Sequence, residues 1–409
     1  MVQEISEIEV KVTLQEIAKL YGRSPQANAL FDLLKKKSVH SVFLQGLVCS
    51  SASVFFGSLQ AKMNRTVLFV LNDADEAGYF YHDLTQMLGQ ESAFFFPSSY
   101  RRAIKYGQRD AANEILRTEV LARLSAGKQI YIVSYPDALA ELVVSKQILD
   151  ERILKLTVGQ QTAQVDIVHQ LRDFGLQETD YVYEPGQFAV RGSILDVYSY
   201  SCEYPFRIDF FGDEIDTIRT FNIEDQLSKD KRDAVEIVPE LASEQSVKQC
   251  FLHFLDADAL VVMNDYTLLH DRIEQIYKDG FSTQSLTEQL EGATEMEAEK
   301  IRREMKAELN LVSASDFQHA LVEHVRIEFG KQPESEVARK QEHLLTAKGD
   351  NQALIAFDMA PQPLFHKNFN LLAQTLEDYQ LQGYTLYILA DSQKQQERLK
   401  DIFDSEELK

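Results

Sequence analysis

The first residues that could do chemistry form a loop between a predicted strand and a predicted helix. The strand over residues 42–44 runs into Gly-Leu-Val-Cys-Ser-Ser-Ala-Ser, residues 46–53, and a helix follows. A strand, such a loop and a helix form the phosphate-binding loop of many nucleotidases. Its lysine reaches the β- and γ-phosphates, and its Ser or Thr hydroxyl binds Mg²⁺. Gly46 and Ser53 stand at the spacing of this motif.

The residues that would bind the phosphates are nevertheless missing from the loop. Ser51 replaces the second glycine of the motif, and Ala52 replaces the lysine. The loss of this lysine removes the main positive charge that would face the γ-phosphate. The alternative is that Gly46 and Ser53 match the motif by chance in an ordinary turn between a strand and a helix.

The metal half of a nucleotidase site is missing as well. Such enzymes hold Mg²⁺ and polarise water with acidic residues at the end of a buried apolar strand. Here the apolar strand over residues 260–263 ends in Met263 and Asn264, and the only nearby carboxylate, Asp265, is shifted along the chain. We therefore expect no ATP hydrolysis, no catalytic residue, no bound metal and no cofactor in this segment.

The surrounding sequence alternates short β-rich runs with helical patterns, which is typical of a parallel sheet flanked by helices. The predicted strands cover residues 41–44, 66–72, 92–96 and 129–134, and the predicted helices cover 51–63, 75–88 and 110–124. Together with the altered loop, this pattern predicts an α/β fold in which a RecA-like parallel sheet carries a degenerate nucleotide site.

The pattern changes twice, which predicts four segments. Residues 1–150 form the first part of the sheet domain, 151–238 form an inserted α+β domain, and 239–345 complete the sheet domain. Residues 346–409 begin a further small α/β domain, with a helix over 365–379, a strand over 385–389 and a helix over 391–403. A polar linker is expected at 332–350, and the chain reads as a fragment of something longer.

Composition narrows the choice of partner. The chain has 42 Lys and Arg against 64 Asp and Glu, a net charge of −22, which opposes sequence-independent binding to DNA phosphates. Three cysteines without C-x-x-C spacing give no zinc knuckle and no disulfide framework. No run approaches the ~18 apolar residues of a membrane span, so we expect a cytoplasmic protein without a membrane partner.

The inserted segment offers a surface for binding another protein. In a strand over residues 206–211, Phe206, Ile208 and Phe210 would face one side, and Arg207, Asp209 and Phe211 the other. A large aromatic ring beside an arginine on an exposed face is typical of an interface hot spot. Alternatively, a neighbouring helix covers Phe211, or the ring lies at the hairpin turn made by residues 212–213.

The inserted segment also carries a long and specific resemblance. The runs EPGQFAVRGSILDVY, residues 184–198, and PFRIDFFGDEIDTIRTFN, residues 205–222, closely resemble domain 2 of bacterial transcription-repair coupling factors, which is similar to domain 2 of the excision-repair protein UvrB. The resemblance implies the order domain 1a, domain 2, domain 1b and the start of domain 3, which matches the four segments.

UvrB itself is the alternative, as a DNA-damage-binding protein. A working UvrB would have an intact phosphate loop, an acidic pair on the 260–263 strand and an aromatic-rich hairpin that clamps DNA. The residue pairs at 51–52 and 263–264 and the short link at 96–101 depart from all three. An active nucleotidase is a third hypothesis, which the altered loop opposes.

The resemblance implies a function that the residues alone do not give. The whole protein of this family is an ATP-dependent translocase on double-stranded DNA that releases stalled RNA polymerase, using ATP and Mg²⁺ in domains beyond residue 409. This segment would recruit UvrA in nucleotide excision repair. By motif position the UvrA contacts are Arg191, Arg207 and Phe211, with the arginines pairing to UvrA carboxylates. A C-terminal domain would mask this surface in the resting protein.

Overall fold

The computed structural model describes residues 13–36, 38–48, 50–99, 110–241, 248–280, 295–296, 310–330, 351–360, 364–366, 368–388, 390 and 392–405. The chain divides into two compact units, Met1–Met359 and Ala360–Lys409, which are described separately.

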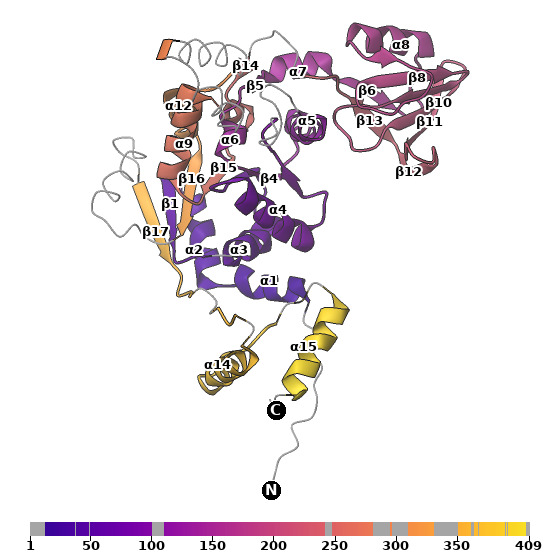
Figure 1. Ribbon diagram of the computed structural model, residues 1–409. Coiled ribbons are helices and arrows are strands. Elements are labelled where there is room, and N and C mark those ends of the chain that lie inside the picture. Colours follow the sequence, from indigo (N-terminus) through magenta and orange to yellow (C-terminus); the bar gives the residue numbers. More distant parts are fainter. Residues whose placement is uncertain are drawn as a thin grey trace. The chain divides into compact units, whose positions relative to one another are not determined.

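Seven strands form the central sheet of the first unit (Figure 1), and every neighbouring pair is parallel. Their order is β17-β1-β16-β15-β2-β4-β3. They are β1 Val39–Gln45, β2 Val67–Val70, β3 Ala93–Phe95, β4 Tyr131–Ser134, β15 Leu260–Met263, β16 Val325–Gly330 and β17 Asn351–Ala356. The predicted α/β class with a RecA-like parallel sheet is confirmed, and the four predicted N-terminal strands correspond to β1 to β4.

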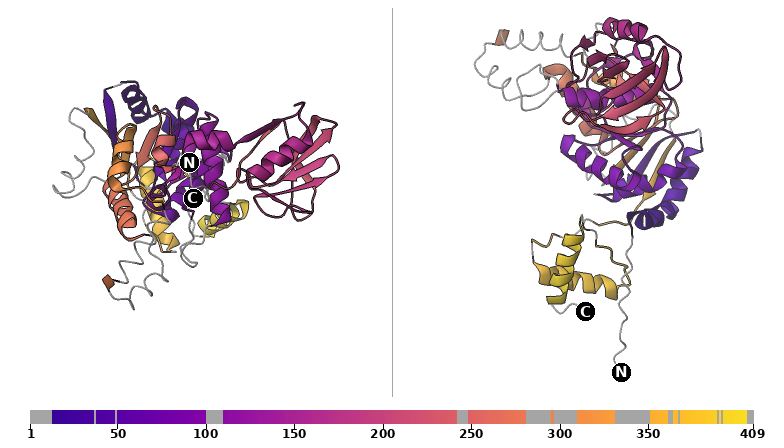
Figure 2. Two further views of the ribbon diagram at one scale, coloured as in Figure 1. Left: turned by 90° about the horizontal axis from the view of Figure 1, so that it is seen from above. Right: turned by 90° about the vertical axis from the view of Figure 1, so that its right-hand side faces the viewer.

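Helices cover both faces of this sheet (Figures 1 and 2). Because parallel crossovers are right-handed, the connections β1-α3-β2 and β2-α4-β3 place α3 and α4 on one face, and β15-α9-α12-β16 places α9 and α12 on the other. The helices are α1 Leu14–Gly22, α2 Pro25–Leu34, α3 Ser51–Leu59, α4 Ala74–Leu88, α5 Ala111–Ser125, α6 Pro136–Leu139, α7 Lys146–Arg152, α9 Tyr266–Asp279 and α12 Ala314–Leu321, with 3-10 turns Gln60–Lys62 and Phe251–Phe254. A small pair of strands, β5 Val143–Val144 and β14 Lys248–Gln249, lies beside them.

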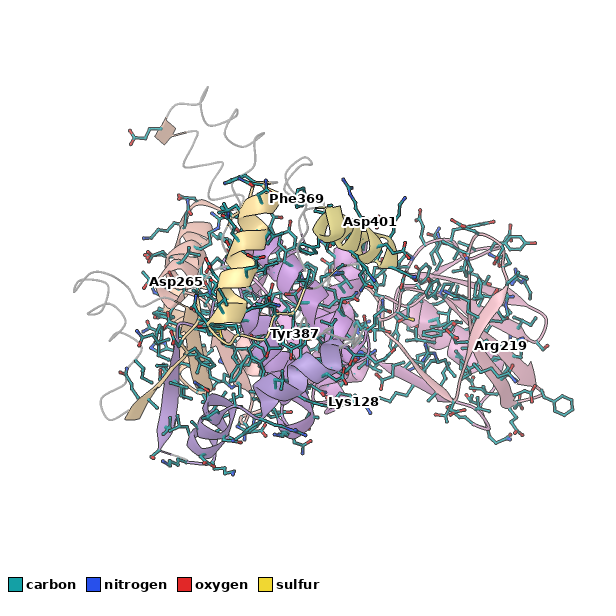
Figure 3. The ribbon with its side chains drawn as sticks, turned by 90° about the horizontal axis from the view of Figure 1, so that it is seen from below. Lys128, Arg219, Asp265, Phe369, Tyr387 and Asp401 are labelled. Carbon is teal, nitrogen blue, oxygen red and sulfur yellow. The ribbon has the colours of Figure 1, made fainter. Side chains whose placement is uncertain are left out.

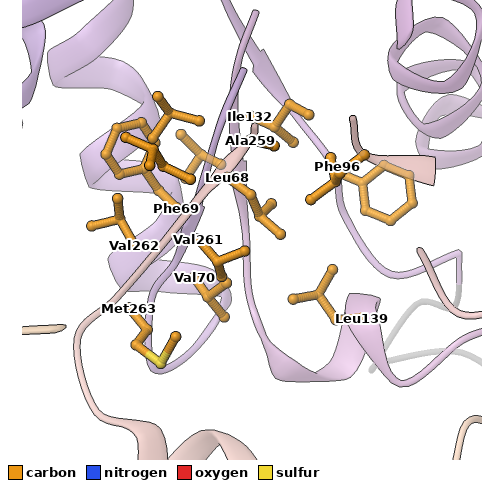
Figure 4. Close-up of a cluster of buried hydrophobic side chains, with 14 of the residues drawn as sticks. Leu68, Phe69, Val70, Phe96, Ile132, Leu139, Ala259, Val261, Val262 and Met263 are labelled. Atoms are coloured by element: carbon orange, nitrogen blue, oxygen red, sulfur yellow. The ribbon is translucent and has the colours of Figure 1, made fainter. Parts of the chain in front are cut away.

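The core lies between the sheet and these helices (Figure 4). All four residues of β2 and all four of β15 are buried. Strands buried on both faces read as continuous apolar runs, which is why the 260–263 run could be recognised in the sequence.

The inserted domain contains a six-stranded sheet with the order β12-β11-β10-β9-β8-β7 and a separate pair, β13 with β6. Its elements are β6 Leu154–Thr157, α8 Gln164–Asp173, β7 Gln177–Glu178, β8 Gln187–Arg191, β9 Ile194–Val197, β10 Phe206–Phe211, β11 Glu214–Phe221, β12 Ser228–Arg232 and β13 Ala234–Ile237. One face of the larger sheet packs on α8 and on β6 and β13 around buried apolar side chains. The predicted α+β insert is confirmed as a fold class.

Strand β17 is not predicted from the sequence. It pairs with β1 from Val39 opposite Asn351 to Gln45 opposite Ala356, so it forms one edge of the central sheet. The sequence assigns residues 346–409 to the last domain, whereas residues 351–356 belong to this sheet. The limits at 150/151 and 238/239 stay predictions.

The second unit contains α14 Phe369–Leu381 and α15 Gln393–Ser405, the two helices predicted there. The strand predicted over 385–389 is wrong for residues 385–388, which form no regular structure. Tyr387 (Figure 3) and Ile388 are exposed, and a strand needs a paired neighbour that the described residues do not supply.

The linker predicted at 332–350 lies outside the described residues. Along the described residues, none of the helices is both long enough and apolar enough to cross a bilayer.

Candidate functional site

The six-stranded sheet of the inserted domain has one side that α8 and the strands β6 and β13 do not cover. We call this side the outer face. Phe206, Ile208 and Phe210 are buried against the domain core, as predicted, so their alternate neighbours on β10 point to the outer face. The polar and aromatic residues on this face include Arg191 of β8, Asp196 of β9, Arg207, Asp209 and Phe211 of β10, and Glu214, Thr217 and Arg219 of β11.

Phe211 is the most exposed of these side chains, with 82% of its surface accessible. It pairs with Glu214 across the two-residue turn Gly212-Asp213, and Gly212 adopts a φ of 65°, which favours glycine. Phe211 therefore lies at the hairpin turn, one of the two alternatives, and remains uncovered there. Burying such a ring removes a large apolar area from water, which favours association.

The predicted arginines share one buried carboxylate. Asp196 is 1% exposed, and its Oδ1 and Oδ2 accept hydrogen bonds from Nε and an Nη of Arg207 at 2.8 and 2.9 Å. Arg191 forms an ion pair with the same Asp196. The guanidinium groups also stack, Arg207 on Phe221 at 4.3 Å and Arg191 on Tyr181 at 4.9 Å. The structure thus brings the two arginines together and holds both in place.

This arrangement changes how Arg207 can act. Its other donors reach the backbone oxygen and the side-chain oxygen of Gln226 at 3.1 and 3.3 Å. The hydrogen bonds to Asp196 raise the pKa of Arg207. Arg207 is therefore charged but mostly bonded within the domain, whereas Arg191 and Phe211 are more open to a partner.

Asp196 and Arg219 were not predicted from the sequence, and Asp209 was placed on this side of the strand without a partner. Asp209 accepts a hydrogen bond from Thr217 at 2.8 Å and forms an ion pair with Arg219. A regular hairpin from the Phe211–Glu214 pair would place Arg219 on the inner side. A β-bulge at Asp216 of β11, opposite the step from Asp209 to Phe210, shifts the register by one residue. This shift turns Arg219 outward, opposite Arg207. The charged residue at 219 was visible, but the bulge that orients it was not.

The predicted nucleotide site lies where β1 leads into α3. Gly46 has a φ of 82°, and its N–H donates to Gly330 at 2.9 Å. A side chain at this position would collide with the carbonyl oxygen of Phe357, which follows β17. Gln45 also accepts a hydrogen bond from Phe357 N–H at 2.8 Å. The segment after β17 therefore packs directly on the start of the loop.

The other loop residues are bonded or buried. The Ser51 hydroxyl bonds the backbone N–H and the carbonyl of Val48, and the Ser53 hydroxyl donates to Asp83 at 2.7 Å and to Ser50 at 2.9 Å. Ala52 is 0% exposed and belongs to the core. Ser51 and Ser53 thus bond to the protein itself, and Ala52 offers no charge.

The strand β15 ends in Met263, which is buried, and Asn264, whose side-chain oxygen accepts a hydrogen bond from Asn72 at 2.8 Å. Asp265 caps α9 by accepting from Leu268 N–H at 2.9 Å. An amide pair therefore stands at this edge of the sheet, and Asp265 has a structural task.

One group of side chains could hold a metal ion among the described residues. His270, Asp271 and Glu274 have ligand atoms within 4.8 Å of one another on α9. They belong to a single helix, and exposed acidic clusters of this kind are common without a bound ion.

Comparison with known proteins also points to the inserted domain. Residues 154–242 match the family model described as "UvrB interaction domain", which covers the whole outer face. Over 212 residues, 52% of the chain, the sequence is 27% identical to the transcription-repair-coupling factor of Bacillus subtilis (strain 168). Over about half of its length the chain is similar to the transcription-repair coupling factors.

Two further coupling factors show the same likeness over shorter stretches. Identity is 29% over 123 residues, 30% of the chain, for the protein of Escherichia coli (strain K12). It is 32% over 115 residues, 28% of the chain, for that of Haemophilus influenzae. The aligned parts make up 18%, 11% and 10% of the three coupling factors, so the chain matches a small part of each. The resemblance seen in the sequence is thereby confirmed.

Proposed function

We propose that this chain is the UvrA-recruiting module of a transcription-repair coupling factor and that the outer face is its docking surface. The observation that carries the proposal is the exposed Phe211 ring beside Arg191 and Arg207, on a UvrB interaction domain. A protruding aromatic ring and arginines are the residue types that dominate binding at protein interfaces. UvrA would bury Phe211 in an apolar pocket and offer carboxylates to the arginines.

We further propose that this segment neither binds nor hydrolyses ATP. The packing of Phe357 against Gly46, the burial of Ala52 and the Asn72–Asn264 pair support this proposal. ATP and Mg²⁺ would act in other domains of the whole protein, as would double-stranded DNA and RNA polymerase. A C-terminal domain of the whole protein would mask the outer face until UvrA is needed.

The proposal is tested by measuring UvrA binding to the chain with Phe211→Ala. A central aromatic anchor contributes about 2 kcal/mol or more, so we expect the Kd to rise at least about 30-fold. Tyr79→Ala is the matched control, because Tyr79 is also an exposed aromatic residue but lies on α4 of the other domain. Unchanged affinity of the Phe211 variant, with an intact fold, contradicts the proposal.

The charge requirement is tested separately with Arg191→Glu. Reversing this charge would leave Asp196 facing a second carboxylate and would repel the proposed acidic surface of UvrA. We expect UvrA to be lost from a pull-down that retains it with the unaltered chain. Retained binding in both the Arg191 and the Phe211 variants would exclude the outer face as the docking surface.

A further inference from the structure

The outer face contains a second arginine–carboxylate pair beside the predicted one. Arg219 pairs with Asp209, and Thr217 donates to the same carboxylate. Arg219 lies directly opposite Arg207 in the ladder between β10 and β11. Figure 3 labels Arg219 on this sheet. The outer face therefore carries three arginines and two aspartates on four adjacent strands.

Structural stability does not account for this arrangement. Two arginines directly opposite each other repel, which destabilises a sheet relative to a neutral pair such as two threonines. Asp196 and Asp209 offset the repulsion by pairing with the arginines, and Glu214, opposite Phe211, adds a third carboxylate at the end of the same face. In a chain with a net charge of −22, three arginines gathered on one face offer pairing groups to an acidic binding partner.

Arg219 also has more bonding capacity left than Arg207. The Arg207 side chain is 15% exposed and bonds both Asp196 and Gln226. The Arg219 side chain is 32% exposed, and among the described residues Asp209 is the hydrogen-bond partner of a terminal Nη, while Nε is buried without a partner. A guanidinium has five N–H donors, four of them on its terminal nitrogens, so Arg219 can donate to a further carboxylate without losing Asp209.

We propose that Arg219 is a further binding residue of the docking surface and that it pairs with a carboxylate of the partner. This inference rests on the proposed function of the outer face. Adjacent strands lie about 4.8 Å apart, so Arg191 on β8 and Arg219 on β11 are separated by roughly 14 Å across the sheet. The fitting partner surface has carboxylates spread over that width beside an apolar pocket for Phe211.

The experiment measures the Kd for UvrA with Arg219→Ala, under the conditions used for Phe211→Ala. We expect a rise of about tenfold and a weaker dependence of the Kd on salt, because one ion pair across the interface is lost. The matched control is Arg172→Ala. Arg172 is also paired with a carboxylate, Glu178, but it lies on α8, which packs on the opposite side of the sheet.

A second variant separates binding from folding. Asp209→Asn with Arg219→Gln removes both charges and leaves no unpaired carboxylate, so the domain should keep its unfolding midpoint and still bind UvrA about tenfold more weakly. The inference is overturned if either Arg219 variant binds like the unaltered chain while Phe211→Ala binds weakly. If Phe211→Ala also binds normally, the proposed docking surface itself is wrong.

Discussion

Two regions of this molecule contain residues that resemble binding sites, and they differ in what their side chains do. At the carboxyl edge of the central sheet, Ser53 bonds Asp83, Asn264 bonds Asn72, and Ala52 is buried. On the outer face of the inserted domain, Phe211 is largely exposed and Arg191 and Arg219 are about one-third exposed. In the first region the polar side chains form hydrogen bonds within the protein, whereas in the second an aromatic ring and parts of two arginines are exposed to solvent.

This difference shows that the backbone geometry of a loop and the chemistry of its side chains are separate features. The turn at Gly46 keeps its positive φ because the packing of Phe357 requires glycine there, whether or not a phosphate binds. An exposed aromatic ring such as Phe211 has no such internal reason, since it contributes little to folding where it stands. The exposed residues of the outer face are therefore the better guide to function.

The largest expected effect comes from trying to reopen the first region with Ala52→Lys. Ala52 is fully buried, so a lysine would overpack the core or bury an ammonium group, and we expect stability to fall by about 3 kcal/mol. Calorimetry with Mg-ATP should still detect no binding. Urea unfolding measures the loss, and Ser50→Lys, at an exposed position two residues earlier, is the control.

One outcome of the Ala52→Lys experiment would contradict this distinction between the two regions. If Ala52→Lys folds with unchanged stability and binds Mg-ATP at micromolar concentration, the site lacked only its lysine. The two regions would then differ by a single charge and not by the packing around it.

Much of the fold could be predicted because its signals are local. Short β-rich runs marked β2 and β4, and a continuous apolar run marked β15. Strand β17 could not be predicted, because only pairing with β1 over about 310 residues of chain makes residues 351–356 a strand.

The same limit applies to the site. Alternation along β10 was enough to predict that Phe211 faces the same side as Arg207, whereas the exposure of its ring was left open and came from the structure. The shared pairing of Arg191 and Arg207 to Asp196 needs the register of three strands, and the orientation of Arg219 needs a bulge. Local alternation says which side of a strand a residue faces, but not which carboxylate lies opposite it.

An intermediate effect is expected from Asp196→Asn, which tests whether the outer face is held in shape from within. The amide removes the charge that both arginines share, and we expect a loss of about 2 kcal/mol in the free energy of unfolding. UvrA should bind about fivefold more weakly, because Arg191 and Arg207 must then be ordered on binding.

The control for this prediction is Asp216→Asn, which removes the same charge from the exposed bulge residue of β11. Equal effects of the two substitutions on UvrA binding would mean that net charge, and not the held arginines, sets the affinity. The outer face would then be less specifically built than the comparison implies.

The smallest expected effect is a pH dependence of stability that involves the central sheet and not the outer face. His324, beside the central sheet, is buried and its Nε2 bonds the carbonyl oxygen of Leu252 at 3.1 Å. Burial lowers the pKa of His324 below the usual 6.5. The unfolded chain therefore takes up the proton more readily, so this contribution to stability is complete above pH 6.5 and is lost as the pH falls toward the folded-state pKa.

His324→Gln, which keeps a donor for Leu252, should remove that part of the pH dependence in thermal unfolding between pH 8 and pH 5.5, whereas His319→Gln on the exposed side of α12 should not. UvrA binding through the arginines of the outer face should not follow this titration. A common pH midpoint for unfolding and for UvrA binding would show that the two regions are coupled.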